Sequence, residues 1–502
     1  MINKLSVAVH RLLFAGLFML SACLVAHAQT ARPRLVVGLV VDQMRWDYLY
    51  YYYDEYGDGG IKRLLKEGFS CENTMIPYVP TVTAIGHASI YTGSTPALHG
   101  ICGNNFYIDG RKVYCCSDTT VTSVGSATKY GQMSPRNMIA STIGDELKMA
   151  TDYRAKVIGV AVKDRGAILP AGHSADGAYW WDQEAGCFVS STFYMAELPK
   201  WVQTFNKKNK GRFKENPLYL PEGVTLTFEM AAEAVENEQL GKDGITDLLT
   251  ISVSSTDGIG HTYSTRGPEN KAAYMQLDRN LEAFFKLLDQ KVGRGEWLFF
   301  LTADHGAAHN YNQQLAHRVP AGGIEDWKLV APLNKYLQEK LHTTANLVLG
   351  ESAYRFYLDH KSIENAGLSA DDIKAEAISW LRRDKRFEYV IDFAQAQNAT
   401  LPPLLRQRLG NSYNAHRTGD IMVITRPQVF SATDSPDYKG TSHGAWNPYD
   451  AHIPCVFMGW HIKAGQTNQP TYMTDIAPTV AALLHIQQPN ACIGTPITAV
   501  TE

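Results

Sequence analysis

The sequence has little excess charge of either sign, and no repeat or low-complexity linker divides it. Its 502 residues carry 47 basic and 50 acidic side chains, which gives a formal net charge of −3. This balance produces no overall field that would recruit nucleic acid or an anionic membrane. A short basic run at residues 207–214 is interrupted by Asn209 and Gly211, so we interpret it as a solvated loop. Any anionic ligand must therefore be attracted locally.

Cysteine is also scarce, and its spacing excludes a cysteine-rich zinc site. The chain has 8 cysteines, and none of them forms the paired CxxC pattern of such sites. A zinc ion would need other ligands. Because the chain is expected to mature where disulfides persist, we predict that some cysteines after Cys23 are paired and that at least one is left over. The cysteines after Cys23 lie at positions 71, 102, 115, 116, 187, 455 and 492.

The first 28 residues are predicted to be a secretion signal. A basic start leads into an apolar stretch, residues 12–25, which is shorter than the roughly 20 residues of a membrane-spanning helix. It ends in the small-x-small sequence Ala26-His27-Ala28, typical of a cleavage site. The tetrapeptide Leu20-Ser21-Ala22-Cys23 resembles a bacterial lipoprotein site, which would leave Cys23 lipidated. We expect a periplasmic or secreted protein, and a lipid-anchored form stays open.

The remaining residues, 29–502, have the pattern of one α/β domain. Hydrophobic residues make up 45% of the chain, enough for a large core, and β-branched runs alternate with helical periodicity. This pattern predicts a mostly parallel central sheet with helices on both faces. The predicted strands are 35–41, 156–162, 248–254, 297–302, 420–424 and 453–458, and the predicted helices are 270–288, 371–382 and 472–484. Two stretches, near 166–222 and 306–440, fit this core poorly and are predicted to be insertions or a cap.

Acidic residues and histidines follow the predicted strands at the points where the strands end. Asp42 comes directly after the first strand, Asp257 follows the third, and Asp304-His305 follows the fourth. In an open α/β sheet, ligands bind outside the carboxyl ends of the strands, so these side chains should meet in one crevice. A single Asp at such a place is more simply a turn or helix-cap residue.

The histidines near these carboxylates change that interpretation. His261 lies four residues after Asp257, and His443 lies in a polar Gly-containing loop. Carboxylate and imidazole together form a ligand set suited to Zn²⁺. These ligands are too many for one tetrahedral site with an open position, so a second ion is expected.

A nucleophile is offered by the segment Pro80 to His87, where two threonines stand at the predicted start of a helix. The N-terminus of a helix has free N–H groups and a positive dipole, which suits a phosphoryl group. Metal coordination could lower the pKa of a hydroxyl enough to form an alkoxide. The simpler alternative is that Thr81 or Thr83 only caps the helix. The local pattern does not choose between the two.

Over nearly its whole mature length the sequence resembles the alkaline phosphatase superfamily, especially its exported bacterial branch with a threonine nucleophile. The matching motifs are Val40-Val41-Asp42-Gln43-Met44-Arg45, Pro80-Thr81-Val82-Thr83-Ala84 with Gly86-His87, Gly103-Asn104-Asn105, Lys163-Asp164-Arg165-Gly166, Ser255-Thr256-Asp257 through His261, Thr302-Ala303-Asp304-His305-Gly306, Ser442-His443-Gly444 and Thr474-Asp475-Ile476-Ala477-Pro478-Thr479. The resemblance implies an alkaline phosphatase-like α/β fold and two zinc ions as cofactors.

Carried over position by position, the resemblance assigns a role to each candidate site residue. It selects Thr83 as the nucleophile and implies that His87 is structural rather than a ligand. One zinc would be surrounded by Asp42, Thr83, Asp304 and His305, the other would be held by Asp257, His261 and His443, and phosphoryl oxygens would be contacted by Asn104, Lys163 and Arg165.

The pair Lys163 and Arg165 favours phosphate monoesters over diesters as small-molecule substrates. With two-residue spacing on an extended loop, both side chains would point the same way, toward the unesterified oxygens of a monoester dianion. Two alternatives remain open. One is a phosphodiesterase or nucleotide pyrophosphatase of the same superfamily, and the other is a non-catalytic, zinc-stabilised binding protein on an inactive hydrolase scaffold.

Overall fold

The computed structural model describes residues 31–502, and residues 33–502 form one compact unit. The predicted secretion signal and Cys23 lie outside the described residues. Within residues 31–502, no helix combines the length and the apolar character needed to cross a membrane.

A ten-stranded sheet forms the centre of the described chain. Its middle strands β11, β1, β10, β7 and β8 are parallel, whereas β19 and β9 pair in antiparallel fashion at the two sides. The strands in sheet order are β20 (Gly465–Thr467), β2 (Phe69–Cys71), β19 (Cys455–Gly459), β11 (Trp297–Thr302), β1 (Leu35–Val41), β10 (Asp247–Val253), β7 (Val157–Ala161), β8 (Gly177–Asp182), β9 (Cys187–Ser191) and β6 (Ser123–Val124). The parallel middle explains why these sequences are continuous apolar runs rather than alternating ones.

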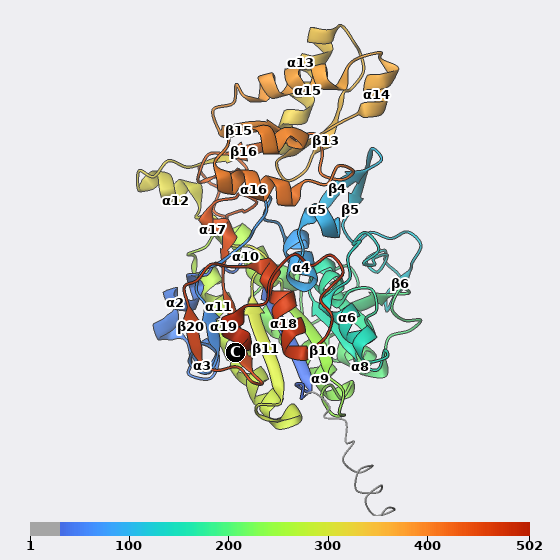
Figure 1. Ribbon diagram of the computed structural model, residues 1–502, viewed down its shortest axis with the longest axis vertical. Helices are drawn as coiled ribbons and strands as arrows, with labels where there is room; N and C mark the ends of the chain where they lie inside the picture. Colours follow the sequence, from blue (N-terminus) through green and yellow to red (C-terminus); the bar gives the residue numbers. More distant parts are fainter. Residues whose placement is uncertain (1–30) are drawn as a thin grey trace, which may run out of the picture. The chain divides into compact units, whose positions relative to one another are not determined.

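Helices pack on both faces of this sheet, as predicted (Figure 1). One close approach places α4 (Thr83–Thr92) against β1. Tyr91 of α4 donates a hydrogen bond to the carbonyl of Gly38 in β1, where a larger residue would clash with the tyrosine hydroxyl and the ring of Phe300. The principal helices are α3 (Ile61–Glu67), α4 (Thr83–Thr92), α6 (Ile143–Ala150), α7 (Asp164–Ala171), α9 (Glu222–Asn237), α10 (Ser255–Tyr263), α11 (Pro268–Leu288) and α18 (Ile476–Leu484).

Most predicted elements form within a residue or two of the expected bounds, but two need correction. Residues 472–484 were expected to be one helix, yet Tyr472 ends the short strand β21 (Thr471–Tyr472) and the α-helix begins only at Ile476. A capping arrangement around Asp475, whose side chain accepts from the Tyr472 N–H, accounts for this late start. The strand predicted at 420–424 forms as β16 (Ile421–Thr425), but it lies outside the central sheet.

The two stretches that fitted the core poorly are arranged differently from each other. Residues 166–222 contribute β8 and β9 to the central sheet and then the helix α8 (Lys200–Asn209). Segment 306–440 instead forms its own four-stranded sheet, and Figure 1 shows this sheet and its helices together on one side of the central sheet. Its strands and helices include β13 (Val348–Glu351), β14 (Arg355–Leu358), β15 (Phe387–Asp392), β16, α13 (Val330–Leu341), α14 (His360–Asn365), α15 (Ala370–Leu381) and α16 (Pro403–Ser412).

Segment 306–440 also has a hydrophobic core of its own, which explains why β16 does not join the central sheet. Phe356, Ile421 and Val423 are buried together in this separate cluster. β16 pairs in antiparallel fashion with both β14 and β15, so both of its edges are already occupied. Apolar periodicity predicted the strand correctly, but it carries no information on which sheet the strand joins.

The prediction of disulfides is wrong for the described cysteines, all seven of which are free. Cys115 and Cys116 illustrate the physical reason. Their sulfurs lie 3.9 Å apart, almost twice the length of a disulfide bond, and both side chains are buried in an apolar cluster. These cysteines therefore act as small apolar core residues.

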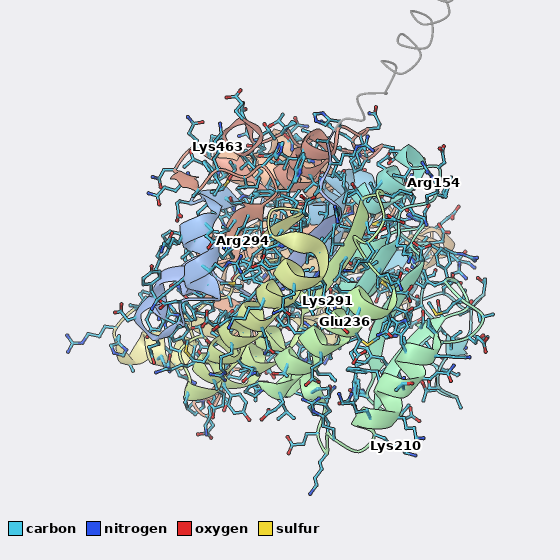
Figure 2. The ribbon with its side chains drawn as sticks, turned by 90° about the horizontal axis from the view of Figure 1, so that it is seen from below. Arg154, Lys210, Glu236, Lys291, Arg294 and Lys463 are labelled. Carbon is cyan, nitrogen blue, oxygen red and sulfur yellow. The ribbon has the colours of Figure 1, made fainter. Side chains whose placement is uncertain are left out.

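The basic run that we interpreted as a solvated loop is exposed in the structure. Lys207, Lys208, Lys210 and Lys214 are all exposed at the end of α8 and just beyond it. Figure 2 shows Lys210 at the periphery of the molecule, away from the ion pair of Lys291 with Glu236. In that pair Nζ of Lys291 is 3.1 Å from Oε1 of Glu236.

Two carboxyl groups lie next to each other inside segment 306–440. Asp326 accepts a hydrogen bond of 2.6 Å from Ser431, and Glu351 accepts one of 2.6 Å from the N–H of Tyr354. Burial, followed by the charge of Asp326, raises the pKa of Glu351 from its ordinary 4.5 to about 8. Burial also raises the pKa of Asp326. The folded protein thus holds a proton here that the unfolded chain releases.

We expect Glu351→Gln to make the protein less sensitive to alkaline pH. Because the folded pKa is raised, the stabilising effect of this proton is complete below about pH 4.5 and is lost as the pH rises toward 8. The amide cannot ionise, so between about pH 5 and about pH 9 the variant should lose less stability than the parent, by on the order of 2 kcal/mol. Denaturant unfolding at both pH values measures this difference, with the exposed Glu364→Gln as control. An unchanged pH dependence in Glu351→Gln would contradict it.

Candidate active site

Four adjacent parallel strands deliver polar side chains to the same edge of the central sheet. Asp42 follows β1, and Asp304 with His305 follows β11. Asp257 lies in α10, the helix that follows β10, and Lys163 comes two residues after β7. These strands are neighbours in the order β11-β1-β10-β7, so their ends meet at one place. The side chains predicted to meet at the strand ends therefore do lie together.

The carboxylates and imidazoles gather in two groups that could each hold a metal ion. One group consists of Asp42, Asp304 and His305, and the other of Asp257, His261 and His443. In each group the candidate ligand atoms lie within 4.8 Å of one another. The groups are adjacent, because the rings of His305 and His443 stack with centroids 3.5 Å apart.

All three histidines of these groups are oriented in the same way. The Nδ1 atom of each ring is 2.7–2.9 Å from a backbone carbonyl: Thr441 for His261, Gly306 for His305 and Thr81 for His443. A carbonyl can only accept, so Nδ1 carries the proton and Nε2 is left with its lone pair. The Nε2 atoms of His261 and His443 are 3.1 Å and 3.7 Å from Oδ1 of Asp257. This orientation is the one that metal-binding imidazoles adopt.

Two carboxylate oxygens in the first group lack a hydrogen-bond partner although they are buried. They are Oδ1 of Asp42 and Oδ2 of Asp304, and each lies 3.4–3.6 Å from Nε2 of His305. Leaving a buried charged oxygen unpaired is costly, and coordination to a cation would remove that cost. The donor set, the orphaned oxygens and the Nε2 lone pairs all fit metal ions.

Burial and neighbouring charges shift the pKa values at the site. Burial lowers the pKa of His261, but the charge of Asp257 raises it above its ordinary value. Burial, helped by the charge of Asp304, raises the pKa of Asp42, and a positive ion would reverse that shift. Burial raises the pKa of Asp257, but His261 and Lys163 hold it well below its usual range. Burial lowers the pKa of His305 and of His443, so both rings stay neutral, as metal ligands must be.

Lys163 lies between the two groups. Its Nζ contacts Oδ2 of Asp42 at 2.7 Å and Oδ2 of Asp257 at 2.5 Å. Burial lowers the pKa of Lys163, but the charges of Asp257 and Asp42 outweigh this effect. The pKa is raised above its ordinary value, so the ammonium remains charged. A positive charge is thus held at the centre of the site, where an anionic group would lie.

The geometry distinguishes Thr83 from Thr81. Thr83 is the first residue of α4, and its hydroxyl lies 3.4 Å from Nε2 of His305. Thr81 instead donates its hydroxyl to the carbonyl of Ala445 at 2.9 Å. Neither threonine caps the helix, because the N-cap residue is Val82. The helix-cap alternative is therefore excluded, and only Thr83 presents its hydroxyl to the ligand groups.

Asn104 lies beside this helix end. Its Oδ1 accepts a hydrogen bond of 2.9 Å from the N–H of Ala84, the second residue of α4. Because the oxygen is occupied, the amide nitrogen of Asn104 is the end that remains for an anionic ligand.

The expected extended loop at residues 163–165 is wrong, because α7 begins at Asp164. Lys163 is the N-cap residue of this helix and Arg165 is its second residue, so their side chains diverge. Lys163 points to the two aspartates, whereas Nη1 of Arg165 donates to the hydroxyl of Tyr114 at 3.1 Å. Both residues still line one cavity of about 290 Å³, together with Trp181.

The ligands are supported by Gln43, His87 and Gly86, of which only His87 was expected to be structural. Gln43 donates from its side chain to Asp257 at 2.7 Å and from its backbone to Asp304 at 3.1 Å, with a left-handed φ of 64°. His87 is fully buried, with Nδ1 3.4 Å from Asp304, which agrees with the structural role expected for it. Gly86 lets α4 approach the backbone of Asp304 closely. No periodicity or motif logic marks such supporting contacts.

A turn in segment 306–440, residues 352–354, contacts two loops of the site. Ser352 donates its hydroxyl to the carbonyl of Asn105 at 2.8 Å, next to Asn104. Two residues later, the hydroxyl of Tyr354 donates to the carbonyl of His443 at 3.4 Å. One turn therefore contacts both the Asn104 loop and the His443 loop.

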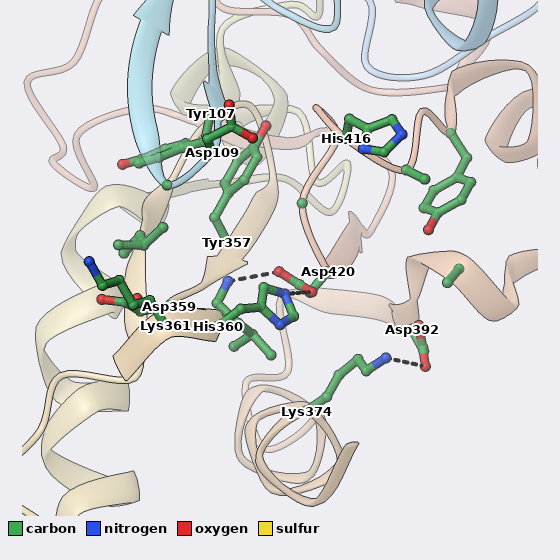
Figure 3. Close-up of a pocket in the computed structure, with 17 residues that line it drawn as sticks. Tyr107, Asp109, Tyr357, Asp359, His360, Lys361, Lys374, Asp392, His416 and Asp420 are labelled. Carbon is green, nitrogen blue, oxygen red and sulfur yellow. Dashed lines mark hydrogen bonds and ion pairs between the residues drawn. The ribbon is translucent and has the colours of Figure 1, made fainter. Parts of the chain in front are cut away.

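Another cavity, of about 380 Å³, lies between the hairpin β4–β5 (Asn105–Ile108 and Arg111–Tyr114) and segment 306–440 (Figure 3). The charged side chains that line it are partly paired with one another. His360 contacts Asp420 at 2.7 Å, and Lys374 contacts Asp392 at 3.0 Å. These pairs are drawn as dashed lines in Figure 3, and we place the functional site at the strand ends instead.

The chain belongs to the type I phosphodiesterase / nucleotide pyrophosphatase family, whose sequence profile matches residues 36–446. Among its relatives is the alkaline phosphatase PafA of Elizabethkingia meningoseptica, 43% identical over 97% of this chain and 98% of its own length. A Myroides odoratus protein named calcium-transporting ATPase is 45% identical over 96% of this chain and 97% of its own. The crystal structure of wild-type PafA superimposes with a TM-score of 0.90 at 42% identity, covering 94% of this chain and all (100%) of that one. The fold is thus alkaline phosphatase-like.

Proposed function

We propose that the protein is an alkaline phosphatase that hydrolyses small phosphate monoesters at a site with two Zn²⁺ ions, through a phosphothreonine intermediate on Thr83. Relatives named alkaline phosphatases at 43% identity, matched over at least 93% of this chain, support the activity class. We also propose that it acts after export, with residues 1–28 as a cleaved signal or with Cys23 lipidated.

One observation carries the metal-dependent part of this proposal. Three histidines from separate segments, two of them buried, all bind a backbone carbonyl through Nδ1 and present Nε2 to a carboxylate-containing group. The first ion would be held by Asp42, Asp304, His305 and Thr83, and the second by Asp257, His261 and His443. Bound there, the ions would supply Lewis acidity for the attacking hydroxyl and charge stabilisation for the leaving oxygen.

The residues of the chain divide the remaining tasks. The Thr83 oxygen attacks phosphorus, and the P–O bond to the alcohol breaks, which leaves a phosphate on Thr83. Water then attacks the same phosphorus, and the Thr83–phosphate bond breaks to release phosphate. The N-terminus of α4 and the amide nitrogen of Asn104 stabilise the charge on the phosphoryl oxygens in both steps. Lys163 and Arg165 add two fixed positive charges on the side of α7.

The choice of monoesters over diesters rests on Arg165. A monoester dianion has one more unesterified oxygen than a diester, and a guanidinium can bind it with charge-assisted hydrogen bonds. In a diester that oxygen carries a second organic group, which a partly buried arginine does not accommodate. The family name includes phosphodiesterases, so family membership does not by itself choose between monoesters and diesters as substrates.

We expect Arg165→Ala to lower kcat/KM for a phosphate monoester by about 100-fold, because a charge-assisted contact worth about 3 kcal/mol is lost. The rate for a diester with the same leaving group should change by less than about 5-fold, since no oxygen is left for the arginine to bind. The measurement is kcat/KM for both esters with both proteins. The exposed Arg154→Ala is the matched control. A parent enzyme that prefers the diester, or equal losses on both esters, would support phosphodiesterase activity instead.

A further inference from the structure

We propose that Tyr114 is a positioning residue that holds Arg165 in place for the extra oxygen of a phosphate monoester. This inference rests on the proposed function, because it assigns a task to the same site. Tyr114 lies at the end of strand β5, more than fifty positions before Arg165 in the chain, and sequence motifs gave it no role.

The hydroxyl of Tyr114 lies between two opposite charges. It donates a hydrogen bond of 2.5 Å to Oδ1 of Asp164 and accepts one of 3.1 Å from Nη1 of Arg165. The direct distance from Nη1 of Arg165 to that carboxylate is 3.9 Å, too long for a good hydrogen bond. The phenol therefore completes a chain that runs from carboxylate through hydroxyl to guanidinium.

Arg165 has little else to fix its orientation. Its Nε is buried without a hydrogen-bond partner, and its backbone N–H is held by Asp164 at 2.6 Å. A long side chain fixed only at its backbone would sample several rotamers, and ordering it on substrate binding would cost entropy. The contact with Tyr114 removes part of that cost before the substrate arrives.

The phenol keeps its proton, as this role requires. Burial, followed by the charge of Asp164, raises the pKa of Tyr114, although Arg165 opposes that shift. Tyr114 and Asp164 line the same cavity of about 290 Å³ as Lys163 and Arg165, so the chain of contacts ends where a ligand can enter.

The hairpin β4–β5 links this contact to the other phosphate-binding element. Tyr114 is the ladder partner of Asn105, and the N–H of Cys115 donates to the carbonyl of Asn104 at 2.9 Å. Asn104 thus directly precedes the two-stranded unit that contacts Arg165 through Tyr114. A change in the hairpin would move both phosphate contacts together.

The test is Tyr114→Phe, which removes only the hydroxyl. We expect kcat/KM for a monoester to fall about 10-fold and the inhibition constant of inorganic phosphate to rise by a similar factor, while a matched diester changes by less than about 2-fold. Asp164→Asn, which removes the charge that the phenol contacts, should give the same selective loss. Tyr107→Phe is the control, because Tyr107 lies on the facing strand and packs in a tilted contact against Tyr357.

A double-mutant cycle with Arg165→Ala separates the inference from the proposed function. If Tyr114 acts through Arg165, Tyr114→Phe should have no further effect on the monoester once Arg165 is alanine. Equal losses on monoester and diester, or losses that multiply in the double variant, would overturn the inference and leave the proposed function intact. If Arg165→Ala alone left the monoester rate unchanged, the monoester clamp in the proposed function would fail, and the inference with it.

Discussion

Thr83→Ala lowers kcat/KM for a phosphate monoester by at least about 10³-fold in our expectation, because it removes the atom that forms the covalent intermediate. The site keeps its charges, so weak residual hydrolysis by direct attack of water should remain. The structure gives the substitution little else to disturb, since the Thr83 hydroxyl has only a 3.4 Å contact with His305. Steady-state kinetics on purified variant and parent measure the effect.

Thr81→Val is the matched control for this result. It removes a hydroxyl two residues away that donates to the carbonyl of Ala445. The loss of one neutral hydrogen bond should cost about 1 kcal/mol of stability and less than about 10-fold in rate. Labelling with a ³²P monoester after acid quench should mark the parent and Thr81→Val but not Thr83→Ala. A labelled Thr83→Ala protein would assign the nucleophile to another residue.

Removing divalent metal should abolish activity almost completely, by at least about 10⁴-fold, since both the nucleophile and the leaving oxygen depend on it. Dialysis against a chelator followed by addition of Zn²⁺ should restore the rate, and metal analysis should then find two ions per chain. His443→Ala should lower the bound-metal content, because His443 is one of three candidate ligands in its group.

His452→Ala is the control for that loss. His452 is also partly buried, but it stacks on Trp46 and bonds to the carbonyl of Glu72, away from both ligand groups. It should keep its metal content and its rate. Activity that survives complete metal removal would contradict the metal-dependent mechanism, whereas full recovery with another divalent ion and none with Zn²⁺ would contradict only the identity of the metal.

The parallel middle of the sheet could be predicted from the sequence because burial on both faces forces continuous apolar runs. The runs at β1 and β11 have the bounds that the pattern predicts. The same logic located the candidate ligands, since a carboxylate directly after such a strand must lie at its carboxyl end. Asp42 and Asp304 are brought together in this way from segments more than 250 residues apart.

What the sequence could not predict depends on contacts between distant segments. The pairing of β16 is decided by the separate core of segment 306–440. The start of α7 at Asp164 is a tertiary outcome, helped by the hydroxyl of Ser254, which accepts from the N–H of Lys163 at 3.1 Å. Gln43 acts through its side-chain amide and its backbone N–H, and Tyr114 acts through its hydroxyl. A single polar residue of this kind leaves no periodic signal. Compartment arguments predicted disulfides, but sulfur–sulfur geometry decides whether they form.

The turn at residues 352–354 connects segment 306–440 to the site. Segment 306–440 has its own sheet and core and so looks like a removable unit, yet Ser352 and Tyr354 brace the loops that carry Asn104 and His443. All proposed metal ligands lie outside residues 306–440, so a chain without this segment would keep them. It would lose the hydrogen bonds that support the loops of Asn104 and His443. The segment is therefore part of the structure that supports the site. Substitutions in this turn should therefore change activity without altering any proposed ligand.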